Sequence, residues 1–401
     1  MTMVYVAGSA DTKWDELAYI KEIIESQGVN AVIVDVGTSG HSSSADITPD
    51  MVAAYHPDGP DAVKSDDRGI AVEAMSVAFE HYTEAHLDDI DGMIGAGGSG
   101  GTALVTPAMR RLPVGVPKVM VSTVASANVA PYVGPADIAM MYSVTDVAGL
   151  NRISRQVLGN AANAVAGMAA NRPPAAASDL PAIGLSMFGV TTPLVTSLVE
   201  RLESRYDPLV FHATGTGGKS MEKLIDSGMI EAVLDMTTTE VADLIVGGVF
   251  PAGEDRFGSV IRTQTPFVGS TGALDMVNFG AMETVPSEFA DRNLYVHNPQ
   301  VTLMRTTPDE NVEFAKFIAA KLNQCDGPVR FLLPEGGVSL IDAPGQPFHD
   351  PVADEALFET LEAEFIPAEN RRLVRVNHNI NDEGFVEATL AAFDEVTKGA
   401  E

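Results

Sequence analysis

The chain has 401 residues, 45 % of them hydrophobic, so it is too long for one ordinary core and is expected to form two domains. Its 25 basic and 55 acidic side chains give a formal net charge of −30, which disfavours binding to nucleic acid or to an anionic membrane. No apolar run approaches the roughly 20 residues of a membrane span. Because the sequence shows no signal peptide and has a single cysteine, Cys325, we expect a cytoplasmic protein.

In the first part of the chain, short apolar runs alternate with segments of helical periodicity. Strands are predicted at 3–7, 31–36, 91–95 and 118–122, and the main helices near 17–24, 69–86 and 148–170. Residues 38–66 are rich in glycine, serine, proline and aspartate, so they are predicted to form a long loop that covers or binds a ligand.

A linker is predicted at 171–178, where two prolines stop a helix and small residues follow. It separates predicted domains at 1–174 and 180–401. The alternation then restarts, with strands at 182–187, 208–212, 231–235, 329–333 and 372–376, and an irregular glycine-rich segment at 247–300. This pattern predicts an α/β protein with two Rossmann-like domains whose mainly parallel sheets face each other across a cleft.

Two glycine-rich loops lie between a predicted strand and a predicted helix. Glycine lets backbone N–H groups approach an anion closely, and a helix N-terminus carries partial positive charge. The second loop resembles a P-loop, although Ala213 replaces its first glycine. Both loops are therefore predicted to hold phosphate, through Gly97, Gly98, Ser99, Gly100, Gly101 and Thr102 in the first and Gly215, Thr216, Gly217, Gly218 and Lys219 in the second.

Other interpretations of these loops stay open. Residues 95–100 match the dinucleotide fingerprint G-x-G-x-x-G, but the next strand ends without an acidic residue for a ribose. Residues 97–101 also match G-x-S-x-G, in which Ser99 is a nucleophile that needs an acid and a histidine. His297, His349 and His378 are available for that role. A plain tight turn, or a solvent-exposed Lys219, requires no ligand.

Further polar residues follow the ends of the other predicted strands. Hydroxyl and carboxylate oxygens suit Mg²⁺ or ribose, and a lysine suits phosphate, although helix capping explains some of these residues equally well. No histidine or cysteine cluster indicates zinc, and no metal ligands are assigned. The additional candidates for the nucleotide site are Asp11, Lys13, Gly37, Thr38, Thr191, Thr192, Asp235, Thr237 and Thr238.

Several of these segments together resemble a known family, that of the N-terminal ATP-binding domain of the tomato mosaic virus resistance protein. The segments include GSADTK (8–13), GAGGSGGT (95–102), MYSVTDVAGLNRIS (141–154), FHATGTGGKSMEKL (211–224) and DMTTTEVADLIVGGV (235–249). The resemblance implies a two-domain α/β fold, binding of ATP with Mg²⁺, and a homo-oligomer. It implies no particular catalytic activity, and the antiviral role of the plant relative is not carried over.

The leading hypothesis is a protein that binds ATP and Mg²⁺ in the cleft between its domains, together with a possible small anionic metabolite. His297, Asn298 and Arg305 are predicted to contact that metabolite. Such a site also suits phosphoryl transfer, which depends mainly on positioning and charge, so an ATP-dependent enzyme is one form of this hypothesis. The alternatives are a nucleotide-gated protein-binding module without turnover and a serine hydrolase that uses Ser99.

Overall fold

The computed structural model describes residues 2–40, 43–172 and 180–398. The chain divides into two compact units, Met1–Ala175 and Ala176–Glu401. Residues 173–178 of the predicted linker lie outside the described residues. Each unit has a parallel sheet with helices on both faces, which confirms the prediction of two Rossmann-like α/β units; the cleft between them stays a prediction.

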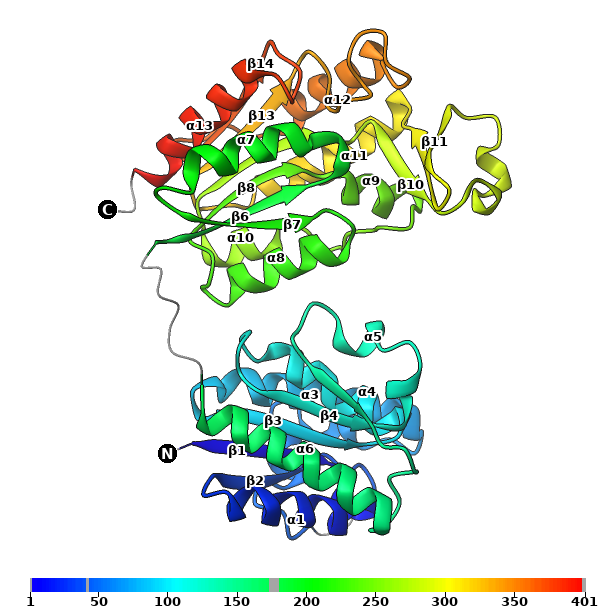
Figure 1. The fold of residues 1–401 in the computed structure, drawn as a ribbon, viewed down its shortest axis with the longest axis vertical. Helices are drawn as coiled ribbons and strands as arrows, with labels where there is room; N and C mark the ends of the chain where they lie inside the picture. The colour runs from blue at the N-terminus through cyan, green and yellow to red at the C-terminus, as the bar shows by residue number, and fades with distance from the viewer. Residues whose placement is uncertain (1, 41–42, 173–179, 399–401) are drawn as a thin grey trace. The chain divides into compact units, whose positions relative to one another are not determined.

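Unit 1 contains a five-stranded parallel sheet in the order β2-β1-β3-β4-β5 (Figure 1). Its strands are β1 (Met3–Gly8), β2 (Asn30–Asp35), β3 (Gly92–Gly97), β4 (Lys118–Ser122) and β5 (Ala139–Tyr142). Its α-helices are α1 (Ala10–Ser26), α2 (Pro49–Ala53), α3 (Arg68–Ala85), α4 (Ser99–Arg111), α5 (Ala130–Val133) and α6 (Arg152–Ala170).

Two apolar layers hold the helices of unit 1 to its sheet. Leu17 and Ile20 recur at helical spacing in α1 and pack with Leu158 of α6 on one face. Phe79 of α3 and Leu104 of α4 belong to the layer on the other face. Because β1 and β3 are buried on both faces, they are nearly continuous apolar runs in the sequence.

Unit 2 contains a six-stranded parallel sheet in the order β14-β13-β9-β8-β6-β7. Its strands are β6 (Ala182–Met187), β7 (Asp207–His212), β8 (Ala232–Thr237), β9 (Phe267–Gly272), β13 (Val329–Pro334) and β14 (Arg371–Val376). Its helices are α7 (Thr192–Leu202), α8 (Thr216–Asp226), α9 (Thr239–Val246), α10 (Gly258–Thr263), α11 (Pro308–Leu322), α12 (Pro351–Glu364) and α13 (Glu383–Thr397). Helices α7 and α13 share one apolar layer, and α8, α9, α11 and α12 share the other.

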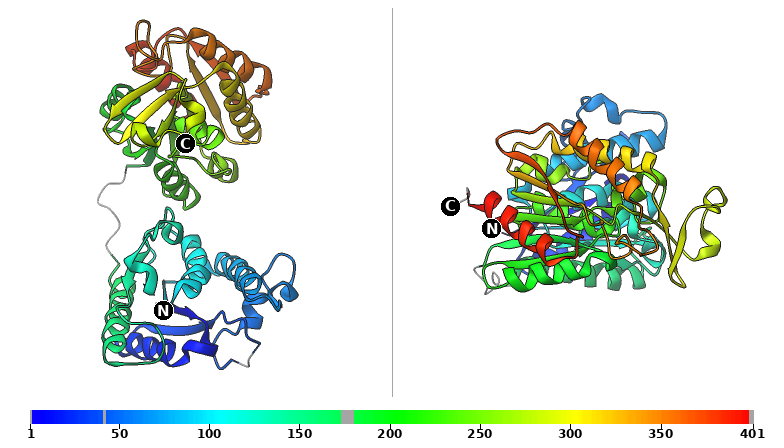
Figure 2. Two further views of the ribbon diagram at one scale, coloured as in Figure 1. Left: turned by 90° about the vertical axis from the view of Figure 1, so that its right-hand side faces the viewer. Right: turned by 90° about the horizontal axis from the view of Figure 1, so that it is seen from above.

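A second, antiparallel sheet of unit 2 extends beyond the parallel one (Figures 1 and 2). It has the order β10-β12-β11, with β10 (Met276–Phe279), β11 (Leu294–Asn298) and β12 (Val301–Arg305). The prediction that 247–300 is irregular was therefore wrong, since α10, β9, β10 and β11 lie in it. These elements are short, and buried Ser270, Thr271 and Asn278 interrupt the apolar periodicity on which the prediction depended.

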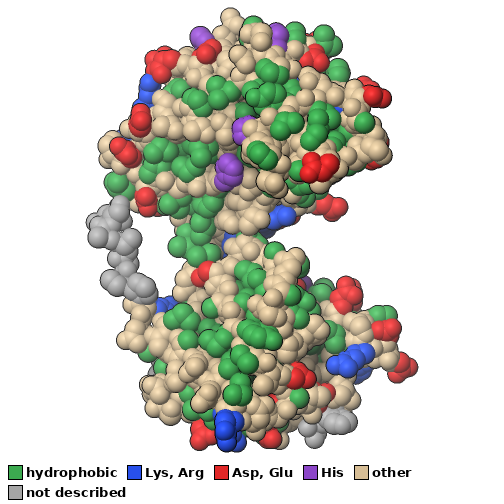
Figure 3. Space-filling view, turned by 45° about the vertical axis from the view of Figure 1, so that its right-hand side comes forward, with side chains coloured by type: hydrophobic (Ala, Val, Ile, Leu, Met, Phe, Trp, Pro, Cys, Tyr) green, Lys and Arg blue, Asp and Glu red, His purple; other side chains and the backbone are tan. Residues whose placement is uncertain are grey.

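The acidic side chains are distributed over the described surface of both units. On the faces drawn in Figure 3, Asp and Glu side chains are scattered in small groups over each unit. No helix among the described residues has the length and apolar character needed to cross a bilayer.

The two parallel sheets share a strand order. In each unit the first strand lies between the second and the third. The second strand is therefore added on one side of the first strand and the third on the other side, and the strand order reverses at this point. Open parallel sheets of this order bind ligands beyond the carboxyl ends of the strands at that reversal point. The reversal lies between β1 and β3 in unit 1, and between β6 and β8 in unit 2. The first glycine loop follows β3, whereas the second follows the edge strand β7.

Candidate functional site

The first glycine loop joins β3 to the N-terminus of α4, at the reversal point of unit 1. Gly98 is the N-cap of α4, and its carbonyl accepts the Thr102 amide at 2.9 Å. Ser99 and Gly100 are exposed, and the amides of a first helical turn have no partner within the helix. The loop thus presents backbone donors and the positive end of a 13-residue helix to solvent.

The glycines of this loop have two different uses. A Cβ on Gly95 would lie 2.7 Å from Met120 Sδ, and a Cβ on Gly97 would lie 3.1 Å from Gly101 Cα, so these positions allow close packing. A Cβ on Gly100 would meet nothing within 4 Å. Gly100 therefore borders open space in which an anion has room to approach the amides.

Thr102 supports the loop from behind. It is fully buried, and its Oγ1 donates to the Gly98 carbonyl at 2.8 Å and lies 2.6 Å from Ser122 Oγ. The Thr102 hydroxyl therefore joins the loop to β4 and is not available to a ligand, contrary to the direct contact that the sequence suggested.

A carboxylate that sequence analysis missed organises the neighbouring strand ends. Asp35, the last residue of β2, is 3 % exposed, and its Oδ1 accepts the amides of Ala10 at 2.9 Å and Gly37 at 2.8 Å. A Cβ on Gly37 would lie 3.0 Å from Asp35 Oδ1 and 3.3 Å from Asp11 Oδ1, so Gly37 leaves room for both carboxylates. The DVG segment after the apolar run of β2 was the available signal.

These strand ends border a cavity of about 620 Å³. Lysine and arginine are absent from the described residues of its lining, which are Ala10, Asp11, Trp14, Asp35, Gly37, Ser39, Gly40, Ser43, Ser44, Thr48, Pro49 and Asp50. A second cavity of about 320 Å³ shares part of this lining and adds Thr38 and Lys64. The predicted binding loop at 38–66 therefore lines both cavities, as far as it is described, although α2 lies within it.

Lys13 does not point a free ammonium group toward a phosphate. Its Nζ donates a short hydrogen bond to the Val147 carbonyl. Glu16 contacts the same segment, since its Oε1 accepts the Gly149 amide at 2.6 Å. Lys13 and Glu16 hold the segment after β5 against α1, so the predicted phosphate contact of Lys13 is replaced by a structural one.

The second glycine loop already holds an anion from the protein. Glu240, in the first turn of α9, is fully buried, and its Oε1 accepts the amides of Gly215 at 2.6 Å and Gly218 at 3.1 Å. A Cβ on Gly218 would overlap the Glu240 carboxylate. The predicted phosphate site at Gly215, Thr216, Gly217, Gly218 and Lys219 is therefore filled by Glu240. Lys219 Nζ donates to the Pro251 carbonyl at 3.5 Å.

Glu240 belongs to a buried network around Arg256. The Arg256 guanidinium lies 3.2 Å from Glu240 Oε2, 2.7 Å from Asp235 Oδ2 and 3.1 Å from Glu222 Oε1. Ser186 donates to Asp235 Oδ1 at 2.5 Å. Burial raises the pKa of Glu222 to about 7, against the attraction of Arg256. Asp235 is thus committed to Arg256 and Ser186, so the predicted use of Asp235 for a nucleotide or its ion is not supported.

The threonines predicted near this network are also engaged. Thr191 Oγ1 lies 2.8 Å from Thr237 Oγ1, and the Thr237 hydroxyl donates to the Ser186 carbonyl at 3.1 Å. Thr238 donates to the Ser270 carbonyl at 3.0 Å, and Thr192 to the Phe188 carbonyl at 3.2 Å. The hydroxyls of Thr191, Thr237 and Thr238 therefore join separate segments of unit 2, and that of Thr192 bonds within its own turn.

The predicted metabolite contacts are not brought together. His297 and Asn298 are exposed on the edge strand β11, next to the turn that leads into β12. Arg305 lies at the far end of β12 and is 5 % exposed. The physical reason is the hairpin itself, since residues near its turn and residues at its open end point to different surroundings.

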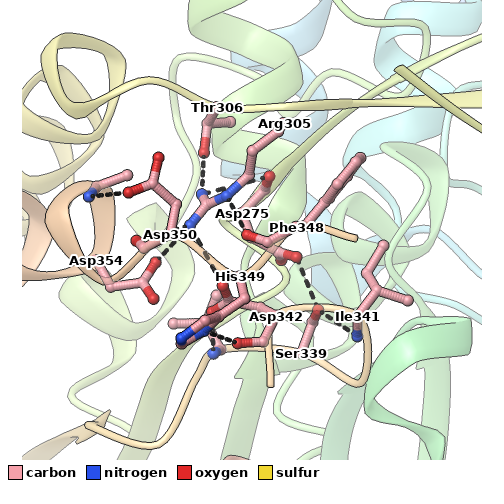
Figure 4. A network of polar contacts seen from close by, with 12 residues as sticks. Asp275, Arg305, Thr306, Ser339, Ile341, Asp342, Phe348, His349, Asp350 and Asp354 are labelled. Carbon is pink, nitrogen blue, oxygen red and sulfur yellow. Dashed lines mark hydrogen bonds and ion pairs between the residues drawn. The ribbon is translucent and has the colours of Figure 1, made fainter. Parts of the chain in front are cut away.

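Arg305 lies among three buried carboxylates (Figure 4). Its Nη2 lies 2.7 Å from Asp354 Oδ1 and 3.3 Å from Asp342 Oδ1, and Asp275 accepts from Ser339 at 2.7 Å. Burial, together with the neighbouring carboxylates Asp275 and Asp354, raises the pKa of Asp342 to about 9. Arg305 is buried and its guanidinium pairs with a carboxylate of the protein, so it is not available to bind an anionic metabolite.

The surroundings of Ser99 bear on the serine hydrolase alternative. Among the described residues, no histidine hydrogen-bonds its hydroxyl, and the described histidines of unit 1 have other contacts. His297, His349 and His378 belong to unit 2. The described residues also include no group of three or more histidine, cysteine, aspartate or glutamate side chains suited to a metal ion.

Comparison with known proteins identifies the family to which the chain belongs. Residues 2–174 match the N-terminal domain, and residues 180–397 the C-terminal domain, of the uncharacterised protein family UPF0261. A UPF0261 protein of Rhizobium meliloti is 56 % identical over 397 residues, which is 99 % of either chain. A UPF0261 protein of Clostridium tetani is 46 % identical over 387 residues, covering 95 % of this chain and 96 % of that protein.

The ToMV resistance protein Tm-1 of Solanum lycopersicum is 42 % identical over 419 residues. The match covers 98 % of this chain but 56 % of the tomato protein. It agrees with the resemblance that the sequence motifs indicated. The chain belongs to the UPF0261 family.

Proposed function

We propose that unit 1 binds the phosphates of a nucleotide, ATP with Mg²⁺, at the first glycine loop. The observation that carries the proposal is the open first turn of α4, at Ser99 and Gly100, at the reversal point between β1 and β3. Amides of such a turn donate to phosphate oxygens, and the helix dipole favours the negative charge. The second glycine loop has no part in this proposal, because Glu240 fills it.

The overall charge of the chain makes this local site necessary. At a formal net charge of −30 the protein repels a nucleotide at long range. Binding then depends on short-range donors, together with Mg²⁺, which cancels part of the phosphate charge.

The test is calorimetric titration of the full chain with ATP and MgCl₂, using the wild type and Gly100→Asp. Aspartate in the first turn of a helix suits the helix dipole, so the variant is expected to fold, while its carboxylate repels phosphate. Ala103→Asp is the matched control, because Ala103 is exposed on the next turn of the same helix. We expect Gly100→Asp to weaken binding at least tenfold and Ala103→Asp to change it little.

Equal binding by the wild type and Gly100→Asp, or no binding by the wild type, would overturn the proposal. Phosphate release followed in the same samples separates two forms of it. Release indicates an ATP-dependent enzyme, whereas binding without release indicates a nucleotide-gated module or an enzyme that awaits a second substrate.

A further inference from the structure

The cavity of about 620 Å³ lies at the carboxyl ends of β1 and β2, and its lining differs chemically from the first glycine loop, which follows the neighbouring strand β3. We infer that this cavity binds the nucleoside half of the nucleotide, with its base against Trp14 and its ribose hydroxyls on the carboxylates of Asp35 and Asp11. The inference rests on the proposed function, because the phosphates of the same ligand would lie at the start of α4. It assigns a ligand class to a cavity through the chemistry of its walls.

The charge of the lining excludes the phosphates. Three carboxylates, Asp11, Asp35 and Asp50, border the cavity, and the described residues of its lining include no lysine or arginine. A phosphate in it would therefore meet like charge with no compensating cation. A nucleoside carries no charge, and its hydroxyl groups donate hydrogen bonds that carboxylates accept strongly.

Asp35 offers a buried and unused acceptor. Its Oδ1 accepts the amides of Ala10 and Gly37, while no described residue hydrogen-bonds its Oδ2. The side chain is 3 % exposed and lines the cavity, so a ligand hydroxyl there would complete its hydrogen bonding.

The position of the cavity matches the span of a nucleotide. In the sheet, β1 lies between β2, which ends in Asp35, and β3, which leads into the glycine loop. Neighbouring strands are about 4.8 Å apart, so the ends of β2 and β3 are separated by roughly 10 Å. That is the scale of the distance from a ribose to the outer phosphates of a nucleoside triphosphate.

Trp14 supplies the apolar surface that a base requires. It lines the cavity and is 38 % exposed, so much of the indole is uncovered. Aromatic rings stack on nucleobases without selecting a sequence or a charge. The volume of about 620 Å³ also lies within the roughly 300–1,000 Å³ of small-molecule sites.

Trp14 also makes the inference directly measurable, because it is the single tryptophan of the chain. The experiment titrates the full chain with adenosine, and separately with inorganic tripolyphosphate and Mg²⁺, following Trp14 fluorescence and binding heat. We expect adenosine to quench Trp14. We expect tripolyphosphate to bind without quenching it, since the phosphates bind at the glycine loop.

Two variants test the ribose contact. Asp35→Asn keeps an Oδ1 that accepts the two amides and replaces the free oxygen with an amide group, so the fold is retained while the charged acceptor is lost. We expect adenosine binding to weaken roughly tenfold or more, and tripolyphosphate binding to persist. Asp15→Asn makes the same charge change on the exposed surface of α1, outside the cavity lining, and should alter neither. If Asp35→Asn unfolds, Asp11→Asn replaces it.

Each outcome separates the two ideas. Tripolyphosphate binding without any adenosine quench would overturn the nucleoside site and leave the proposed function intact. Adenosine quenching without tripolyphosphate binding would contradict the proposed function and leave the cavity as a nucleoside site. Quenching of Trp14 by Mg²⁺ or tetramethylammonium, with none by adenosine, would show that the carboxylates serve a cation and would overturn the inference.

Discussion

Units 1 and 2 share a strand order but use the carboxyl ends of their strands in opposite ways. In unit 1 the first turn of α4 faces solvent, and the carboxylates of Asp11 and Asp35 border a cavity. In unit 2 the corresponding polar groups are buried and paired, with Glu240 and Arg256 at the centre of one network. A glycine loop before a helix is therefore not by itself evidence for a ligand, because a neighbouring carboxylate satisfies the same amides.

The energetic consequence follows from burial. A buried charge is costly unless it is paired and hydrogen-bonded, so removal of one partner in unit 2 leaves an uncompensated charge. Substitution of exposed residues in unit 1 changes the free energy of unfolding little. Substitutions in unit 2 should therefore act on folding, and substitutions in unit 1 on binding.

The largest expected difference between the units comes from adding one methyl group to each glycine loop. Gly217→Ala would drive a Cβ into the His212 backbone, whereas a Cβ on Gly100 meets nothing within 4 Å. We expect Gly217→Ala to lower the free energy of unfolding by about 3 kcal/mol or more. Gly100→Ala, in the first turn of a helix, should change it by about 1 kcal/mol or less. Thermal unfolding followed by circular dichroism measures both, and equal effects would contradict the contrast.

Removal of the internal anion is expected to have the next largest effect. Glu240→Ala leaves two buried amides unpaired and removes one of the three carboxylates around Arg256, so we expect a loss of about 3–5 kcal/mol in unfolding free energy. Sulfate should recover part of this loss by occupying the vacated loop, relative to chloride at equal ionic strength. Glu254→Ala, at an exposed position of the same unit, is the control. A small loss without sulfate rescue would show that Glu240 does not act as the anion of the loop.

The Arg305 cluster should make the stability of unit 2 depend on pH. Burial raises the pKa of Asp342 from its ordinary 3.8 to about 9. The protonated carboxyl therefore stabilises the fold fully below about pH 4, and this contribution is lost as pH rises through 9. We expect the wild type to lose stability between about pH 5 and 9, on the order of 1 kcal/mol per pH unit more than Asp342→Asn.

Denaturant titrations at several pH values measure this slope. Glu359→Gln, at an exposed position of α12, provides the control and should follow the wild type. If the free energy of unfolding varies with pH in the same way for the wild type and Asp342→Asn, Asp342 is ionised in the folded protein and its pKa is not raised.

The smallest effect is expected for Asp11→Asn in unit 1. Asp11 is exposed and its carboxylate has no described hydrogen-bond partner, so the unfolding free energy should change by less than about 0.5 kcal/mol. Circular dichroism during chemical unfolding gives this value, and the same sample can be titrated with ligand. A loss above about 2 kcal/mol would mean that the strand ends of unit 1 are structural, like those of unit 2.

The sequence predicted the fold more completely than the site. Apolar runs and helical spacing identified nearly every strand and helix of the parallel sheets, because those elements are buried on one side or both. The antiparallel sheet was missed because its strands are short and buried polar residues, such as Asn278 and Thr302, interrupt their apolar runs. Local pattern carries no information on how such residues are satisfied by distant partners.

For the same reason, the second glycine loop was misinterpreted. Its sequence specifies a helix N-terminus that accepts an anion, and that is what forms; the anion is Glu240, which lies 22 residues beyond Gly218 in the chain. Arg305 was likewise interpreted as a free cation, although it is buried and pairs with Asp354 at 2.7 Å. Asp35 was overlooked because a single acidic residue after a strand gives a weak signal until its neighbours are known.

The most direct test of the account is hydrogen–deuterium exchange of the full chain with and without ATP and Mg²⁺. We expect slower exchange of the amides at 98–102 when the nucleotide is present, and no change at 214–220, where Glu240 already binds the amides of Gly215 and Gly218. Slower exchange at 214–220, or no change at 98–102 under saturating nucleotide, would contradict it.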